Sequence, residues 1–169
     1  KRLGRIRHLG FSAHGALPVM ERFLEVYGPH MEFGQIQLNW LDWELQDARG
    51  KVALLERYHL PVWVMEPVRG GRLARLAPED EAELRRLRPD ESIPAWSFRF
   101  LQSLPQVAVI LSGMSSLEQL QDNLRTFRAA RPLSAGEEET LLSIARRMTA
   151  GVPCTACRYC TSHCPRELD

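Results

Sequence analysis

The chain has 169 residues, of which 44% are hydrophobic and 25% charged, and this is the composition of an ordinary globular protein that can bury one core. Its formal net charge of +1 gives no electrostatic reason to expect nucleic acid or a membrane surface as a partner. No apolar run approaches the length of a membrane span.

Short apolar runs alternate with amphipathic stretches in the first part of the chain. The predicted elements are a strand over residues 8–12, a helix over 20–27, a strand over 33–38 and a helix marked by Val52, Leu55 and Tyr58. Pro18 suits the first turn of the helix over 20–27, and Gly28 suits its end.

The alternation continues in the second part. The predicted elements are a strand over residues 61–65, a loop containing Arg69-Gly70-Gly71, a charged surface helix over 78–88 and a more apolar helical segment over 93–104. Residues 107–110 are β-branched and apolar, which is typical of a central parallel strand. Two capping boxes, Ser115 with Glu118 and Ser134 with Glu137, predict the starts of two further helices.

Strands that alternate with helices predict a parallel sheet covered by helices, and about four such units are visible. The four tryptophans are therefore expected to pack in the core rather than to contact a cofactor. They are Trp40, Trp43, Trp63 and Trp96.

All of the cysteines lie in one short stretch near the end of the sequence. Cys154, Cys157, Cys160 and Cys164, followed by Pro165, form the pattern C-x2-C-x2-C-x3-C-P. Bacterial ferredoxins use this run to hold cubane iron–sulfur clusters. We therefore expect a 4Fe–4S cluster.

Two other readings of the cysteines stay open. Structural zinc usually takes its ligands from two separated pairs, which this compact run lacks. A disulfide is disfavoured because the sequence shows no secretory signal. Reduced thiols imply a reducing compartment, so we expect a cytoplasmic protein.

The order of the motifs resembles the C-terminal half of the aldo-keto reductase family. The matching stretches are residues 6–12, 35–40, 65–71 and 111–120, together with Asn123. The cysteine run narrows the resemblance to the branch with a ferredoxin-type region after the barrel. It implies an α/β fold: the C-terminal half of a (β/α)8 TIM barrel over residues 1–150, followed by a short ferredoxin-like cysteine loop, the truncated start of an iron–sulfur region, over 151–169.

The resemblance also implies a bound NADP or NAD. Ser12 and Gln35 match residues that hold the nicotinamide carboxamide, and Met65 stands where many members have a stacking tyrosine. The adenosine end is expected to meet Ser112, Gly113, Met114, Gln119 and Asn123. Gly113 and Gln119 replace the Lys and Arg that NADP-preferring members often carry.

The positions of these residues in the predicted strands support a role in cofactor binding, although a simpler explanation exists for two of them. Ser12, Gln35, Met65 and Ser112 fall near the C-terminal ends of predicted strands, where barrel active sites lie. Ser12 and Gln35 could instead be ordinary polar strand ends, but the shared position at strand ends favours the functional interpretation.

The family's catalytic tyrosine, lysine, aspartate and histidine belong to the first half of the barrel, so no catalytic residue is assigned here. The chain opens at Lys1, and we expect it to be a piece of a longer nicotinamide-dependent oxidoreductase acting on a small carbonyl or alcohol, with an electron-transfer protein as a further partner. The alternatives are a non-catalytic iron–sulfur electron-transfer or binding module and a structural metal site.

Overall fold

The structure is a computed structural model in which residues 3–150 are described. The strands are β1 (Phe11–Ala13), β2 (Gly34–Gln37), β3 (Val62–Met65) and β4 (Val107–Ile110). The α-helices are α1 (Leu17–Tyr27), α2 (Asp42–Leu45), α3 (Ala48–Arg57), α4 (Pro78–Leu87), α5 (Ile93–Gln102), α6 (Leu117–Phe127) and α7 (Ala135–Thr149). Two short 3-10 helices are η1 (Gly28–His30) and η2 (Arg69–Ala74).

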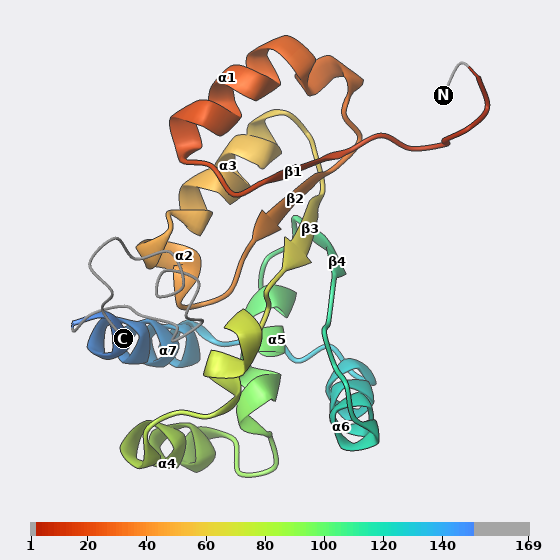
Figure 1. The fold of residues 1–169 in the computed structure, drawn as a ribbon. Helices are drawn as coiled ribbons and strands as arrows, with labels where there is room; N and C mark the ends of the chain where they lie inside the picture. The colour runs from red at the N-terminus through yellow and green to blue at the C-terminus, as the bar shows by residue number, and fades with distance from the viewer. Residues whose placement is uncertain (1–2, 151–169) are drawn as a thin grey trace, which may run out of the picture.

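The four strands form one parallel sheet whose spatial order, β1-β2-β3-β4, is also their order in the chain (Figure 1). Each connection between neighbouring strands contains at least one helix, as a parallel crossover requires. The predicted α/β architecture with a parallel sheet is confirmed.

The two faces of the sheet have different environments. Along β2 and β3, alternate residues are buried (Gly34, Ile36, Val62 and Val64) and pack with the helices. The residues between them, Gln35, Gln37, Trp63 and Met65, are only half-buried and lie on the opposite face. One face thus carries the apolar core, and the other presents polar and polarisable side chains.

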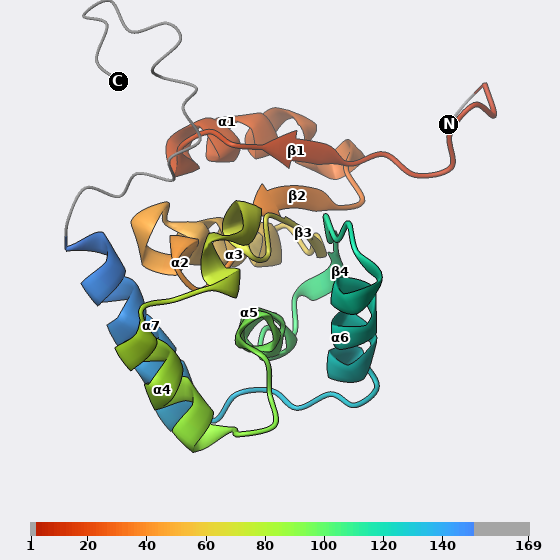
Figure 2. The same cartoon turned by 60° about the horizontal axis from the view of Figure 1, so that its bottom comes forward.

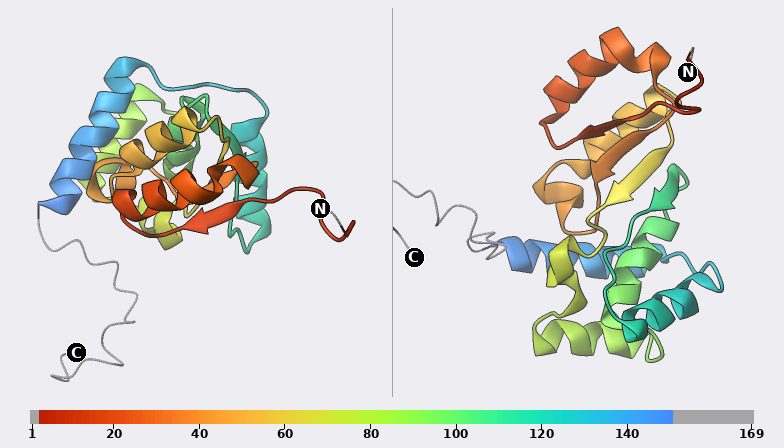
Figure 3. Two further views of the ribbon diagram at one scale, coloured as in Figure 1. Left: turned by 90° about the horizontal axis from the view of Figure 1, so that it is seen from above. Right: turned by 45° about the vertical axis from the view of Figure 1, so that its right-hand side comes forward.

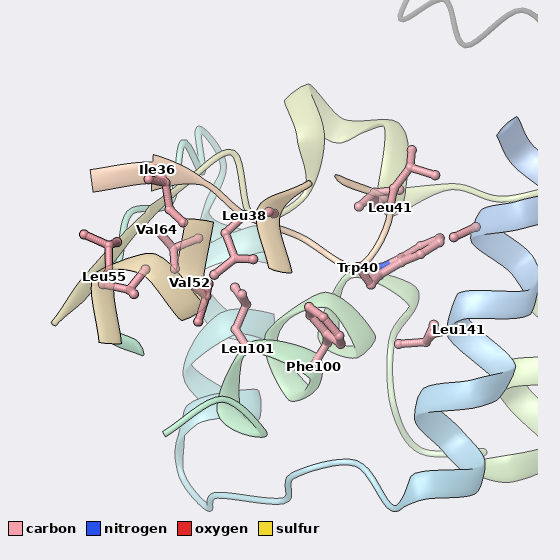
Figure 4. Packing of buried hydrophobic residues seen from close by; sticks show 14 of the residues in the cluster. Ile36, Leu38, Trp40, Leu41, Val52, Leu55, Val64, Phe100, Leu101 and Leu141 are labelled. Atoms are coloured by element: carbon pink, nitrogen blue, oxygen red, sulfur yellow. The ribbon is translucent and has the colours of Figure 1, made fainter. Parts of the chain in front are cut away.

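The core is formed by one face of the sheet together with residues of α1, α3, α5 and α7. Figure 4 shows Ile36 and Val64 of the sheet facing Val52 and Leu55 of α3, with Phe100 farther along the same cluster. The tryptophans mostly pack as expected. Trp40 and Trp96 are 1% exposed, Trp43 meets Phe100 edge-on, and Trp63 stacks on Phe33 with ring centroids 3.9 Å apart.

Helices α4 and α7 lie side by side, as the second view shows (Figure 2). Arg147 of α7 donates hydrogen bonds to Asp80 and Glu83 of α4, at 2.6 and 2.8 Å from the same guanidinium nitrogen. The capping box predicted from Ser134 and Glu137 is present at the start of α7.

Three expectations about local structure need correction. Residues 107–110 form β4 as predicted, but β4 is an edge strand of the sheet in the described part of the chain, and its residues are not fully buried. The cap of α6 is Ser116 rather than Ser115. The expected loop at Arg69 begins η2, a 3-10 helix interrupted at Gly70 and Gly71.

Within residues 3–150, no helix is both long and apolar enough to cross a bilayer.

Candidate functional site

A cavity of about 580 Å³ lies beyond the C-terminal ends of β3 and β4. One wall is the end of β3 with the turn that follows, residues 65–68, 70 and 71. The other is the segment after β4, residues 111–115, with Gln119 and Asn123 of α6. Pro94 and Phe98 of α5 close its base. Because β3 and β4 are parallel, both segments leave the sheet at the same edge (Figure 1).

The turn after β3 has an unusual backbone. Glu66 and Arg69 have φ angles of 59° and 49°, and Gly70 and Gly71 have 62° and 92°. A left-handed conformation costs a non-glycine residue roughly 1–2 kcal/mol. The two glycines adopt it freely, but Glu66 and Arg69 need other contacts to hold them there.

Those contacts converge on Asp42, a fully buried carboxylate at the start of α2. Its Oδ2 accepts hydrogen bonds from Gln37 at 2.7 Å, Asn39 at 2.8 Å and the Nε of Arg69 at 3.1 Å. Asn39, in the loop between β2 and α2, also donates to the backbone carbonyl of Glu66 at 2.9 Å. Glu66 is therefore bound to Asn39, and Arg69 to Asp42. This network fixes one wall of the cavity.

Sequence reasoning did not find this network. The one local signal was the spacing of Asn39 and Asp42, because the Asn39 side chain accepts the Asp42 backbone N–H at 2.8 Å. Arg69 lies 27 residues away from Asp42 in the sequence. Two buried atoms of the network, Asp42 Oδ1 and Arg69 Nη1, have no hydrogen-bond partner within the described residues.

The opposite wall is built from the segment after β4 and the start of α6. Asn123 donates to Ser112 Oγ at 3.2 Å and to Met114 Sδ at 3.4 Å. Gln119 Oε1 accepts the Ser115 backbone N–H at 2.8 Å. Contacts within this wall therefore hold the loop against α6.

Most of the predicted cofactor residues meet at this cavity. The six that line it are Met65, Ser112, Gly113, Met114, Gln119 and Asn123. Ser12 and Gln35 do not line it, although they are neighbours in register on β1 and β2. Gln35 connects them to the cavity because its amide nitrogen lies 3.7 Å from Met65 Sδ. A role in cofactor binding stays a prediction for all eight.

A second cavity, of about 640 Å³, lies beneath α6. Apolar side chains of α5, β4 and α6 form most of its lining, among them Leu101, Val107 and Leu124. It lacks the turn after β3, and it holds fewer of the predicted residues. We therefore take the cavity beyond β3 and β4 as the candidate site.

The predicted cluster ligands Cys154, Cys157, Cys160 and Cys164 lie outside the described residues. Within residues 3–150, no group of three or more His, Cys, Asp or Glu side chains is arranged to hold a metal ion. The iron–sulfur prediction is therefore not tested by the structure.

Comparison with known proteins gives a consistent result. The model of the Aldo/keto reductase family matches residues 1–145. No curated protein matches the sequence significantly.

Solved structures give the same fold. An aldo-keto reductase from Bacillus halodurans (AKR11C1, holo form) is 25% identical with a TM-score of 0.65, and the match covers 85% of this chain and 52% of that one. The thermostable aldo-keto reductase Tm1743, solved with the inhibitor epalrestat, is 20% identical with the same TM-score, covering 85% and 50%. A putative 2,5-diketo-D-gluconic acid reductase B is 15% identical with a TM-score of 0.65, covering 85% and 47%. The chain thus spans about half the length of the solved structures that it matches.

Proposed function

Since the chain belongs to the aldo/keto reductase family, we propose that it supplies the dinucleotide-binding, C-terminal half of a nicotinamide-dependent oxidoreductase that interconverts a small carbonyl compound and an alcohol. One observation carries the proposal. Six predicted residues, Met65 from the end of β3 and five from residues 112–123, surround one cavity at the C-terminal edge of a parallel sheet, where ligands of such sheets bind.

The cavity fits part of a dinucleotide. Its volume of about 580 Å³ lies within the usual range for small-molecule sites. Its polar groups are hydroxyls, amides and one carboxylate among apolar side chains, a combination that suits a ribose and a heteroaromatic base. At Gly113, a Cβ would meet no atom within 4 Å, so the rim is open on that side.

The residues of this chain then have distinct tasks. A bound nicotinamide dinucleotide supplies a hydride to a carbonyl carbon, or receives one from an alcohol carbon, while a proton is added to or leaves the oxygen. Ser12 and Gln35 would offer hydrogen bonds to the carboxamide from the open face of the sheet. Met65 would offer its sulfur to the ring, a favourable contact with an aromatic group. We assign no proton donor to this chain.

We further propose that Cys154, Cys157, Cys160 and Cys164 hold a 4Fe–4S cluster, because four closely spaced thiolates are the donor set that such clusters use. This makes an electron-transfer protein a candidate partner and a reducing cytoplasm the expected location. A non-catalytic iron–sulfur module and a structural metal site are the competing functions.

The first test is dinucleotide binding to the full chain, measured by titration calorimetry with NADH and NADPH. Asn123→Leu removes a polar group of the cavity wall and should weaken binding about tenfold, the value of one lost hydrogen bond. Gln121→Leu, on the exposed side of the same helix, is the matched control and should change the affinity little. Equal effects of the two variants would contradict the assignment of the cavity.

The second test concerns turnover and metal content. The chain alone should turn over neither NADH nor NADPH with carbonyl substrates. Robust turnover would refute the proposal that this chain supplies only the dinucleotide-binding half of the enzyme. Anaerobic purification should give a brown protein with bound iron and sulfide, whose absorbance is bleached by dithionite. A colourless protein containing zinc would favour the structural metal site.

A further inference from the structure

We propose that the cavity selects a dinucleotide with a free ribose 2′-hydroxyl, as in NAD(H), over one with a 2′-phosphate, as in NADP(H). This inference rests on the proposed function, because it presumes that the cavity wall formed by residues 112–123 meets the adenosine end of a dinucleotide. It rests on three features of the cavity walls. These are their charge, the backbone N–H groups at the start of α6 that are already hydrogen-bonded, and the open space at Gly113.

The first feature is charge. Glu66 is the one charged residue among those lining the cavity in residues 3–150, and it is an acid. A phosphate monoester carries a charge of roughly −1.5 to −2 at neutral pH. Removing such a group from water without a cation beside it is costly, and a carboxylate nearby adds repulsion. A neutral hydroxyl incurs neither penalty.

Nearby arginines do not supply the missing cation. Arg69 follows the lining residue Val68, but its side chain is 8% exposed and is bound to Asp42. Arg72, three residues further on, is not among the residues that line the cavity. On the other wall, α6 begins at Leu117, and Arg125 lies eight residues further on, a distance of about 12 Å along the helix axis. Arg125 is also paired with Asp122 at 3.0 Å.

The second feature is the start of α6. The exposed N–H groups of a helix N-terminus can bind a phosphate without any basic side chain. In this chain, side-chain oxygens already accept hydrogen bonds from two of the backbone N–H groups near the start of α6. Gln119 Oε1 occupies the Ser115 N–H at 2.8 Å, and Ser116 Oγ accepts the Gln119 N–H at 3.2 Å. A phosphate would have to displace these oxygens, whereas a hydroxyl can bond to the amides of Gln119 and Asn123 as they stand.

The third feature is Gly113, which makes the inference testable by a gain of function. Its φ angle is not in the left-handed region, and a Cβ there would meet open space. Gly113→Lys should therefore place a flexible ammonium on the cavity rim without disturbing the loop. Gly113→Met adds a side chain of similar length without charge and is the matched control.

The experiment measures the dissociation constants of NADH and NADPH for the full chain by titration calorimetry at 50 mM salt. We expect NADPH to bind at least tenfold more weakly than NADH. In Gly113→Lys the ratio of the two constants should shift at least fivefold toward NADPH, and 500 mM salt should reduce that shift because salt screens exposed charges. Gly113→Met should leave the ratio as it is.

Glu66→Gln gives a second, independent variant, since it removes the one carboxylate of the walls. It should shift the same ratio toward NADPH by about threefold, even if the rim variants fold poorly. Equal or tighter binding of NADPH to the unmodified chain would overturn this inference and leave the proposed function standing. Failure of both dinucleotides to bind would overturn the proposed function, and this inference with it.

Discussion

At the scale of single residues, Asp42 holds the site together. It is fully buried, it accepts three side-chain hydrogen bonds at one oxygen, and it carries the ion pair to Arg69. The sequence could not reveal this arrangement, because its partners come from β2 and from a turn whose left-handed backbone no residue pattern specified. By contrast, Met65 and Asn123 could be anticipated, since each lies in a motif that the family resemblance made recognisable.

Removing the guanidinium of Arg69 should show how much the Asp42–Arg69 ion pair contributes to the free energy of unfolding. In Arg69→Met, the buried Asp42 carboxylate loses its cation, and the free energy of unfolding should fall by about 3–5 kcal/mol. Arg57→Met breaks an exposed ion pair to Glu21 and should cost less than about 1 kcal/mol. Urea unfolding at pH 7 measures both variants. A small, equal loss in the two would mean that the Asp42 network does not stabilise the turn.

At the scale of elements, helix starts show what a pattern can and cannot decide. The sequence Ser115-Ser116-Leu117-Glu118-Gln119 contains two overlapping capping patterns, one from each serine. The structure selects Ser116, because the Ser115 N–H is bound by the Gln119 side chain. At α7 there is one candidate, Ser134, and the prediction was right. Apolar periodicity located most other elements within a few residues, but it missed the four-residue helix α2, which is too short to show a period.

The α7 cap should make stability depend on pH. Arg88 hydrogen-bonds the Glu137 carboxylate and, against the opposing effect of burial, lowers the pKa of Glu137 from 4.5 to about 2. A lowered folded-state pKa stabilises the protein above pH 4.5, and this contribution disappears as the pH falls from 4.5 to 2. Glu137→Gln should therefore lose about 1–2 kcal/mol at pH 7 and much less at pH 2.5.

Thermal unfolding of the unmodified chain and Glu137→Gln at both pH values is the measurement. Glu139→Gln removes an exposed partner of Arg146 on the same helix and should show no comparable pH-dependent difference. A Glu137→Gln penalty that is the same at both pH values would show that the ion pair with Arg88 does not set the pKa.

At the scale of the whole molecule, the described residues form a sheet with two open edges. β1 and β4 each have a strand neighbour on one side only, and the two further views show both edges (Figure 3). The helix beside β4 is exposed as well. Leu117, Leu120, Leu124 and Phe127 of α6 lie on one helical face, and their exposed fractions are 67%, 38%, 54% and 46%. The sequence predicted the parallel sheet and its helices. The position of β4 at the sheet edge could not be predicted from the sequence, because an apolar strand can have the same composition at the edge and in the centre of a sheet.

Open strand edges beside an apolar helix face favour association. The chain on its own should therefore self-associate at micromolar concentrations, as seen by sedimentation velocity. Leu124→Lys should shift the distribution toward monomer, because it places a charge in the middle of the apolar face of α6. Leu87→Lys, at an exposed apolar position on α4, should leave the distribution unchanged. A chain that is monomeric at every concentration would contradict this expectation.

The match between strand order and chain order has a consequence for biosynthesis. Within residues 3–150, each of the four strands pairs only with the strands immediately before and after it in the sequence, so none of the four waits for a partner among them that is made much later. A ribosome that delivers the chain from its N-terminus can add one βα unit at a time to a sheet that already exists. Assembly of these four strands in the cell is therefore expected to keep pace with translation, because each new strand meets a partner that has just been made.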